Sequence, residues 1–461
     1  MCAFWNLNVL AAIGRLECHM PRNITRRSFI KSAALGVAAM KTGPAFAASK
    51  SANEKLDIAI IGLGGQGNYS YQNVRKENIV AVCDVDSIRA GKAFERFDAS
   101  QRFTDYRRML DKLHNSIDAV VVATPDHTHF HPAYMAMDLG KHLYLEKPMA
   151  HNVWEIRKLT ELAARKGVAT QLGMQRHVKD NMHRVTELIQ AGAIGDVTEV
   201  HSWVDSKRGM FPRVKEQKSV PSTLDYNLWL GPVEHQPYDP EITPYGWRFW
   251  WDFGTGEAGN WGCHILDIPF DALNLDYPTH AGADGPDVHP EMTTKDMHSW
   301  FNFPAKGSRK ALELHWYQAQ GGPAILKKYG LPAGGNNLFI GTNGILLCGF
   351  DERILLQQDS SGKWEAKLTH SDAMGFDVPA ETVPDSPGFH NEFLNACKGD
   401  DTAPTCNFGY SGPLSETVLL ANAAYRSKTS FDWDHKSMTC VDAPTAQAHI
   451  KPTYKKGWEM A

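Results

Sequence analysis

Near residue 60, an almost wholly apolar run, residues 56–61, leads directly into the turn Gly62-Leu63-Gly64-Gly65-Gln66-Gly67. A short continuous apolar run is typical of a strand that is buried on both faces, as in a parallel sheet. An acidic residue, Asp84, ends the next apolar run and lies 17 positions (84 − 67) after the last glycine. Together these features predict the first βα unit of a dinucleotide-binding sheet.

The residues of this turn have distinct expected roles. Gly62 permits the tight turn, Gly64 lets the backbone approach a pyrophosphate, and Gly67 allows the following helix to pack closely on the strand. Gly65 and Gln66 complete the turn at the N-terminus of that helix, which attracts negative charge. A purely structural turn is the alternative, because glycine serves tight turns in many folds.

Asp84 is expected to bind the ribose hydroxyls of an adenosine. Its carboxylate also opposes a 2′-phosphate, since two unit charges ~4 Å apart cost about 4 kcal/mol at an effective dielectric constant near 20. That energy corresponds to roughly a thousandfold in affinity. NAD is therefore the expected cofactor, and NADP is disfavoured.

More buried runs follow at residues 79–83, 119–123 and 142–145, with helically spaced stretches such as 88–97 and 106–113 between them. Strands that alternate with helices are typical of βαβ units. The pattern therefore predicts an α/β protein whose first domain is a doubly wound parallel sheet of the Rossmann type.

The composition of the sequence changes near residue 176, beyond which aromatic residues cluster. Runs of alternating apolar and polar residues at 311–316 and 337–341 predict strands of a more open sheet. We expect a Rossmann domain over residues 55–176. The rest, 177–461, is expected to form an α+β domain with an open, largely antiparallel sheet.

The first 47 residues hold six Lys/Arg and one Glu, and the remainder has a formal charge of 42 − 51 = −9. Within this leader, Thr25-Arg26-Arg27-Ser28-Phe29-Ile30-Lys31 precedes a mildly apolar run, 32–40, and then Ala45-Phe46-Ala47. This order predicts a twin-arginine export signal over residues 1–47, cleaved after Ala47, with Met20 as an alternative start. The mature protein is then expected in the periplasm or otherwise exported.

Charge and hydropathy exclude two other classes of partner. The chain has 461 residues with a net charge of −4 and no long stripe of Lys and Arg, so a nucleic-acid partner is not expected. Lys41 interrupts the apolar part of the leader far short of the ~20 residues that span hydrocarbon. Stable membrane insertion after processing is therefore not expected either.

Polar residues stand at the ends of two buried runs. The first is Thr124-Pro125-Asp126-His127-Thr128-His129, and the second is Glu146-Lys147-Pro148. An open α/β sheet binds its ligands at the carboxyl ends of its strands. With the glycine turn, these segments resemble the Gfo/Idh/MocA oxidoreductase family over essentially the whole mature chain.

That resemblance implies roles for individual residues. Lys147 would lie near both the nicotinamide and the reacting hydroxyl, with Glu146 and Pro148 as its positioning neighbours. Thr124, Pro125 and His129 would belong to the cofactor wall. Independently, an ammonium beside a hydroxyl stabilises the alkoxide that develops as hydride leaves, whereas the alternative is a surface lysine before a turn.

In the second domain the matching segment is Gly259-Asn260-Trp261-Gly262-Cys263-His264-Ile265-Leu266-Asp267. His264 stands where the family has its acid/base histidine, and a satisfied core histidine is the alternative. Asn260 replaces an aspartate of many members, so it is expected to bind a substrate hydroxyl without taking a proton. Asp267, three residues after His264, is expected to contact substrate or to orient that imidazole ring.

The segment Gly173-Met174-Gln175-Arg176-His177 closes the Rossmann domain. Gln175 is expected to contact nicotinamide, and Arg176 and His177 to contact substrate. A hinge between the domains is an equally open interpretation. The aromatic segment 247–253 is interpreted as core, although aromatic rings also stack on sugars and Arg248 favours a sugar site.

No metal site is expected. A candidate site is the group His127, His129 and His131. However, successive positions of an extended segment point to opposite faces, and no set of carboxylate and histidine ligands is fixed nearby.

The resemblance implies an NAD-dependent oxidoreductase that acts on a secondary hydroxyl of a carbohydrate or glycoside, with C3 as one candidate. An NAD-dependent glycosidase that oxidises its sugar transiently is the nearest alternative. A non-catalytic NAD-binding sensor is a distant one. The family's open sheet also implies a homo-oligomer.

Overall fold

The computed structural model describes residues 54–206, 208–210, 213–214, 216–318, 321–331, 334–358, 360–368 and 381–460. The predicted export leader, residues 1–47, lies outside them. The described residues belong to one compact unit, Ser49–Ala461. None of the helices within these ranges has both the length and the apolar character needed to cross a membrane.

The N-terminal part holds a six-stranded parallel sheet in the order β3-β2-β1-β4-β5-β6. Its strands are β1 (Asp57–Ile61), β2 (Asn78–Cys83), β3 (Arg102–Phe103), β4 (Ala119–Val122), β5 (His142–Leu145) and β6 (Thr170–Leu172). Its helices are α2 (Gln66–Val74), α3 (Ser87–Phe94), α4 (Tyr106–Leu113), α5 (Phe130–Asp138) and α6 (Val153–Lys166), with short 3₁₀ turns η1 (Ala99–Gln101), η2 (His114–Ser116) and η3 (Asp126–Thr128). The predicted doubly wound sheet is confirmed, and its order reverses between β1 and β4, where such sheets bind ligands.

The second sheet has ten strands among the described residues, in the order β14-β13-β12-β11-β7-β10-β9-β8-β15-β16. They are β7 (Val197–Val204), β8 (His280–Asp284), β9 (Met297–Phe303), β10 (Leu312–Gln318), β11 (Asn337–Gly341), β12 (Ile345–Cys348), β13 (Arg353–Gln358), β14 (Trp364–Leu368), β15 (Phe431–Asp434) and β16 (Thr439–Val441). Neighbours pair antiparallel except β7 and β10, which run parallel. The predicted largely antiparallel sheet is therefore confirmed.

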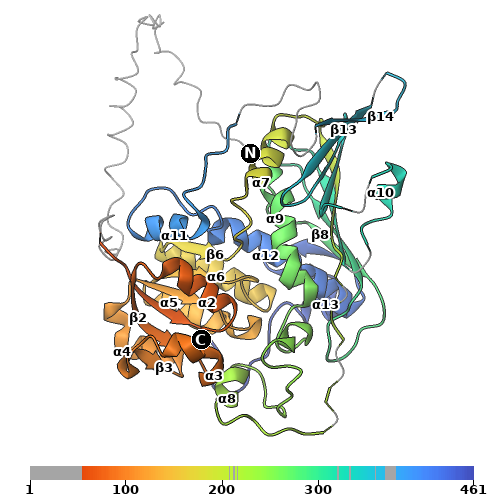
Figure 1. Ribbon diagram of the computed structural model, residues 1–461. Helices are drawn as coiled ribbons and strands as arrows, with labels where there is room; N and C mark the ends of the chain where they lie inside the picture. The colour runs from red at the N-terminus through yellow and green to blue at the C-terminus, as the bar shows by residue number, and fades with distance from the viewer. Residues whose placement is uncertain are drawn as a thin grey trace, which may run out of the picture. The chain divides into compact units, whose positions relative to one another are not determined.

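Helices cover one face of this sheet. The helical segments of the second part are α7 (Asp180–Gln190), α8 (Tyr226–Leu230), η4 (Gly246–Phe249), η5 (Ala258–Gly262), α9 (Cys263–Ala272), α10 (Ile325–Lys328), α11 (Phe389–Cys397), α12 (Phe408–Ser427) and α13 (Pro444–Gln447). In Figure 1, α9 and α12 lie between the large sheet and the orange N-terminal part, and α12 packs on both β8 and α6. Alternation along β10 directs Leu314 and Trp316 toward these helices and His315 and Tyr317 to the other, outer face.

Candidate active site

A cavity of about 630 Å³ opens where the carboxyl edge of the first sheet meets the segments around η4 and η5. Its wall contains most of the residues singled out from the sequence: Gly62, Gly64, Gly65, Gln66, Asp84, Thr124, Pro125, Glu146, Lys147, Gln175, Arg176, Asn260 and His264. Four others, Gly67, His129, His177 and Asp267, lie behind the wall. Residues from both halves of the chain thus share one hollow.

The turn between β1 and α2 has no room for a side chain at Gly62 or at Gly67. Gly62 has φ +86°, and a Cβ there would lie 2.5 Å from the Ala123 carbonyl oxygen. A Cβ on Gly67 would lie 2.0 Å from the Gly62 oxygen. Only glycine lets α2 begin this close to β1 and β4, and the close approach leaves the backbone of Gly64 and Gly65 on the cavity wall.

Asp84 follows β2 at the edge of this turn. Its Oδ2 accepts the Leu63 N–H at 2.8 Å, and its Oδ1 accepts the Asp86 N–H at 2.9 Å. Burial raises the pKa of its carboxyl above the usual value, against the effect of these hydrogen bonds. The bare glycine turn beside a fixed carboxylate fits the pyrophosphate and ribose of a dinucleotide.

Lys147 lies just beyond β5 and reaches across the cavity. Its Nζ donates to the Asn260 backbone oxygen at 2.5 Å and to the Asn260 Oδ1 at 3.2 Å. Burial lowers the pKa of this ammonium. The contact ties the end of the first sheet to η5, where Asn260 lies.

Glu146 is held beside Lys147 by neutral donors. Gln175 Nε2 donates to its Oε1 at 2.9 Å and the Ser70 hydroxyl at 3.3 Å, with Gln66 Nε2 at 3.4 Å. Burial raises the pKa of Glu146 to about 7, although Lys147 and these donors oppose the rise. Gln175 therefore has a partner in the cofactor half of the cavity, as well as Tyr144 at 2.9 Å.

A chain of polar contacts that the sequence analysis missed supports Asn260 from behind. Asn260 Nδ2 donates to Glu257 Oε2 at 2.9 Å, and Glu257, which is 0% exposed, accepts Arg208 Nε at 2.6 Å. Arg208 also lines the cavity and donates to the Tyr245 hydroxyl at 2.6 Å. Arg208 and Glu257 are 49 positions apart, and no local motif signals such a pair.

His264 lies in the first turn of α9 and lines the same cavity. Burial, with the positive charges of Lys147 and Arg176, holds its pKa well below the ordinary value. Its ring is therefore neutral near pH 7 and keeps a nitrogen lone pair, although the same positive charges make it a weaker base. Its Nδ1 is buried and, among the described residues, has no hydrogen-bond partner.

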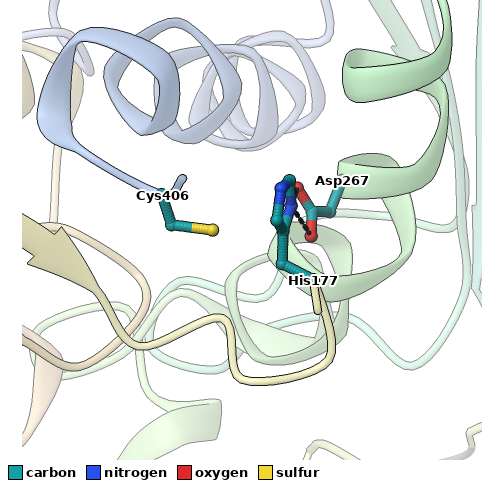
Figure 2. Close-up of side chains that lie close together, drawn as sticks. All are labelled: His177, Asp267 and Cys406. Carbon is teal, nitrogen blue, oxygen red and sulfur yellow. Dashed lines mark hydrogen bonds and ion pairs between the residues drawn. The ribbon is translucent and has the colours of Figure 1, made fainter. Parts of the chain in front are cut away.

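The expectation that Asp267 orients His264 is wrong. The Asp267 carboxylate is 3.0 Å from His177 Nδ1 through each of its oxygens and accepts the Tyr410 hydroxyl at 2.6 Å. Figure 2 shows the two side chains facing each other, with the Cys406 sulfur nearby. Asp267 and His177 are 1% and 6% exposed and pair behind the cavity wall, so neither is in position to touch substrate.

Two expectations about the histidines after β4 also need correction. The segment is helical, η3 followed by α5, so its side chains do not alternate as in a strand. His129 lies behind the cofactor wall and contacts the carbonyl oxygens of Pro148 at 2.7 Å and Thr124 at 2.8 Å. It braces the two strand ends against each other.

Aromatic residues close the other end of the cavity. Trp247, Trp250 and Phe253 belong to a buried cluster, as the core interpretation expects. Trp247 and Arg248 also line the cavity, with the Arg248 guanidinium 4.2 Å from the Trp247 ring centre. The segment thus contributes to both the core and the site.

Comparison with known proteins gives two matches along the chain. Residues 56–174 match the family model described as "Oxidoreductase family, NAD-binding Rossmann fold", and residues 201–295 match "Oxidoreductase family, C-terminal alpha/beta domain". Over these residues the chain is similar to the two domains of the Gfo/Idh/MocA oxidoreductases.

Two curated dehydrogenases match part of this chain at low sequence identity. Inositol 2-dehydrogenase of Rubrobacter xylanophilus is 30% identical over 156 residues, 33% of this chain and 44% of that protein. Myo-inositol 2-dehydrogenase of Thermotoga maritima is 24% identical over 30% of this chain and 42% of its own length. The matched segment thus spans less than half of these curated relatives.

A solved structure resembles the fold over a greater length. An inositol dehydrogenase homologue of Azotobacter vinelandii, complexed with NADH and myo-inositol, has a TM-score of 0.54 at 16% identity and covers 84% of this chain and 99% of its own. At that identity the likeness concerns the fold alone.

Proposed function

We propose that this Gfo/Idh/MocA chain is an NAD-dependent oxidoreductase that oxidises a secondary hydroxyl of a sugar, glycoside or related polyol. The observation that carries the proposal is the shared cavity, where Lys147 and His264 face the same hollow as the glycine turn. The inositol dehydrogenases among its relatives support an alcohol on a ring as the substrate class.

Bound nicotinamide would supply the hydride acceptor. The chain's own residues would accept the hydroxyl proton and stabilise the negative charge on the substrate oxygen. Lys147 Nζ, held by the Asn260 oxygens, stabilises negative charge on the substrate oxygen as the proton leaves. The neutral His264 ring takes that proton, because Asn260 has no carboxylate to do so. Glu146 and Gln175 hold the Lys147 end of the cavity in place.

A panel assay tests the reaction class. Purified protein is mixed with NAD and with free sugars, inositols and nitrophenyl glycosides, while NADH absorbance and nitrophenol release are followed together. We expect NADH to form in step with the keto product. Lys147→Ala and His264→Ala should each lower turnover by roughly 10²–10⁴-fold, the usual loss for a general acid-base group.

Lys141→Ala is the matched control, because Lys141 precedes the same strand but does not line the cavity. It should keep near-normal turnover. Nitrophenol release without net NADH would instead identify a glycosidase that oxidises its sugar transiently. Binding of NAD with neither product would identify a sensor, and both results contradict the proposal.

We propose NAD over NADP, and a carbohydrate hydroxyl such as C3 as the site of oxidation. Asp84 supports the first choice through its negative charge beside the glycine turn. Trp247 and Arg248 support the second, since a ring and a guanidinium suit the apolar face and hydroxyls of a pyranose. The Rossmann and substrate domains are proposed to divide near residue 176.

We also propose that the chain is exported by the twin-arginine route through residues 1–47 and works as a homo-oligomer in the periplasm. A reporter fused to residues 20–60 should be exported, and replacing Arg26 and Arg27 by Lys should retain it in the cytoplasm. Unchanged export of the double variant would refute the route. Light scattering on the purified protein tests the oligomer, and a monomeric mass would refute it.

A further inference from the structure

A cluster of histidines and glutamates lies on the outer face of the ten-stranded sheet. Glu199 and His201 belong to β7, and Glu313 and His315 belong to β10. The parallel register sets Glu313 opposite Glu199 and His315 opposite His201. Because residues two apart on a strand share a face, the register gathers all four on one patch, and none of them lines the cavity.

The atoms that a metal would use converge in this patch. His201 Nε2 is 2.9 Å from Glu199 Oε1, and His315 Nε2 is 3.5 Å from the same oxygen. His315 Nε2 is also 3.3 Å from Glu313 Oε1. Two ligand atoms that each bind a tetrahedral zinc ion at about 2.0–2.1 Å lie about 3.3 Å apart. Glu199, His201 and His315 have ligand atoms that all lie within 4.8 Å of one another, a spacing that one ion could bridge, and Glu313 borders this group through His315.

One ring nitrogen in the patch lacks a hydrogen-bond partner. His201 is 4% exposed, and among the described residues its Nε2 has no hydrogen-bond partner. Glu199 Oε1 is close to this nitrogen but is not aligned for a hydrogen bond. A buried polar atom left in this state costs free energy, which a cation between nitrogen and carboxylate would remove.

The other ring nitrogens already have partners. His201 Nδ1 is 3.0 Å from the Tyr317 hydroxyl, and His315 Nδ1 is 3.1 Å from His298 Nε2. Metal-binding histidines almost always donate the second ring N–H to an outer acceptor, which frees the ligating nitrogen. When Nδ1 donates in this way, both Nε2 lone pairs face the glutamates.

The two histidine rings also lie against each other. Their centres are 4.7 Å apart and their planes differ by 9°. This stacking holds His201 and His315 side by side on the patch.

We propose that Glu199, His201 and His315 bind one divalent transition-metal ion of the zinc class on the outer face of the sheet. Two imidazoles with a carboxylate are typical of such ions, whereas Ca²⁺ and Mg²⁺ prefer oxygen ligands alone. The site lies outside the proposed reaction cavity. It departs from the sequence-based expectation of no metal, because its ligands come from two strands that are distant in sequence.

A second group, His177, Asp267 and Cys406, has ligand atoms as close together (Figure 2). There the imidazole and carboxylate already satisfy each other, and Tyr410 takes a further carboxylate lone pair. Within the described part of the chain, the contacts of this buried group leave no unpartnered ring nitrogen comparable with His201 Nε2. Its Cys406 thiol would give a metal bound there a thiolate absorption band, which separates the two sites in an experiment.

Metal titration of the full purified chain tests the proposal. Protein stripped with a chelator is titrated with Zn²⁺ in competition with a chromogenic chelator, and folding is checked by circular dichroism. We expect one ion per chain. Tyr317→Phe should weaken binding roughly 10–100-fold, as loss of an outer partner does, and the ligand changes Glu199→Gln and His315→Asn should weaken it further.

Two control variants keep the test specific. His280→Asn changes another histidine with a carboxylate partner on the same sheet, and Cys406→Ala removes the thiol of the buried group; both should bind as the wild type does. Bound Co²⁺ should show no thiolate charge-transfer band. Absence of a retained ion, binding unaffected by both ligand changes, or a thiolate band would each overturn the proposal.

Discussion

At the scale of single residues, the cavity depends on side chains whose partners are already in place. Lys147 is held by Asn260, which is held by Glu257, which is held by Arg208. Preorganised groups of this kind need no rearrangement when charge develops on substrate, which is a main source of rate enhancement. Within this set, Asn260 is an amide, so it positions the ammonium without competing for its proton.

Asp84 is the residue whose change should alter the choice of cofactor. Asp84→Ser removes the negative charge that would face a 2′-phosphate, so we expect NADP binding to improve relative to NAD by up to about a thousandfold. Dissociation constants for the two cofactors, measured by fluorescence, check this. Asp98→Ser removes the same charge from an exposed position of the same sheet domain and should leave the ratio unchanged. An unaltered ratio in Asp84→Ser would show that Asp84 does not face the adenosine ribose.

At the scale of elements, α9 and the segment after β6 are joined through His177 and Asp267. The pair fixes α9, which carries His264, against the segment that carries Gln175 and Arg176. Burial alone lowers the pKa of His177, but Asp267 and Cys406 raise it well above its ordinary value. The stabilisation is therefore complete below the unfolded pKa near 6.5 and is lost as the pH rises through the folded pKa.

Asp267→Asn should lower the free energy of unfolding by about 3 kcal/mol near pH 6, since it leaves a buried imidazolium without its counter-ion. The deficit should shrink at alkaline pH, where the wild type loses the same interaction. Urea unfolding at pH 6 and pH 9 measures both effects. Asp432→Asn breaks a comparable but exposed pair with His280 and should cost less than about 1 kcal/mol. Equal losses at the two pH values would contradict the charged pair.

At the scale of the whole molecule, the two sheets share one core and buried polar contacts. Arg157 of α6 donates to Glu416 of α12 at 2.8 and 2.7 Å, with side chains 9% and 0% exposed. The Leu172 N–H of β6 donates to the Cys406 oxygen at 2.9 Å. Because the first sheet and its helix α6 share buried polar contacts with α12 and the segment before it, we expect neither part to unfold alone.

Glu416→Gln should therefore lower stability across the molecule by about 3–5 kcal/mol, the usual cost of leaving a buried charge unpaired. Far-UV circular dichroism and tryptophan fluorescence should report one coincident unfolding transition in both proteins. Glu161→Gln, which removes the exposed partner of Lys158 on α6, is the matched control and should cost less than about 1 kcal/mol. Two separate transitions in the wild type would refute this coupling.

Local patterns in the sequence determined much of the first sheet. The predicted strands at 119–123 and 142–145 correspond to β4 and β5 within one residue, because continuous burial on both faces leaves an unmistakable apolar run. The edge strands β3 and β6 were not predicted, since one has two residues and the other contains Gln171. Glycine turns and strand ends likewise pointed to the cavity wall, because they depend on backbone conformation and on sheet polarity.

Only the tertiary structure decided which polar side chains meet. Sequence spacing paired Asp267 with His264, three positions away, but the fold pairs it with His177, 90 positions away. The contact of Arg208 with Glu257 and the patch of His201 and His315 arise in the same manner. Periodicity in a sequence encodes which face of an element is buried, whereas partners across the core depend on how separate elements pack, and no local pattern carries that information.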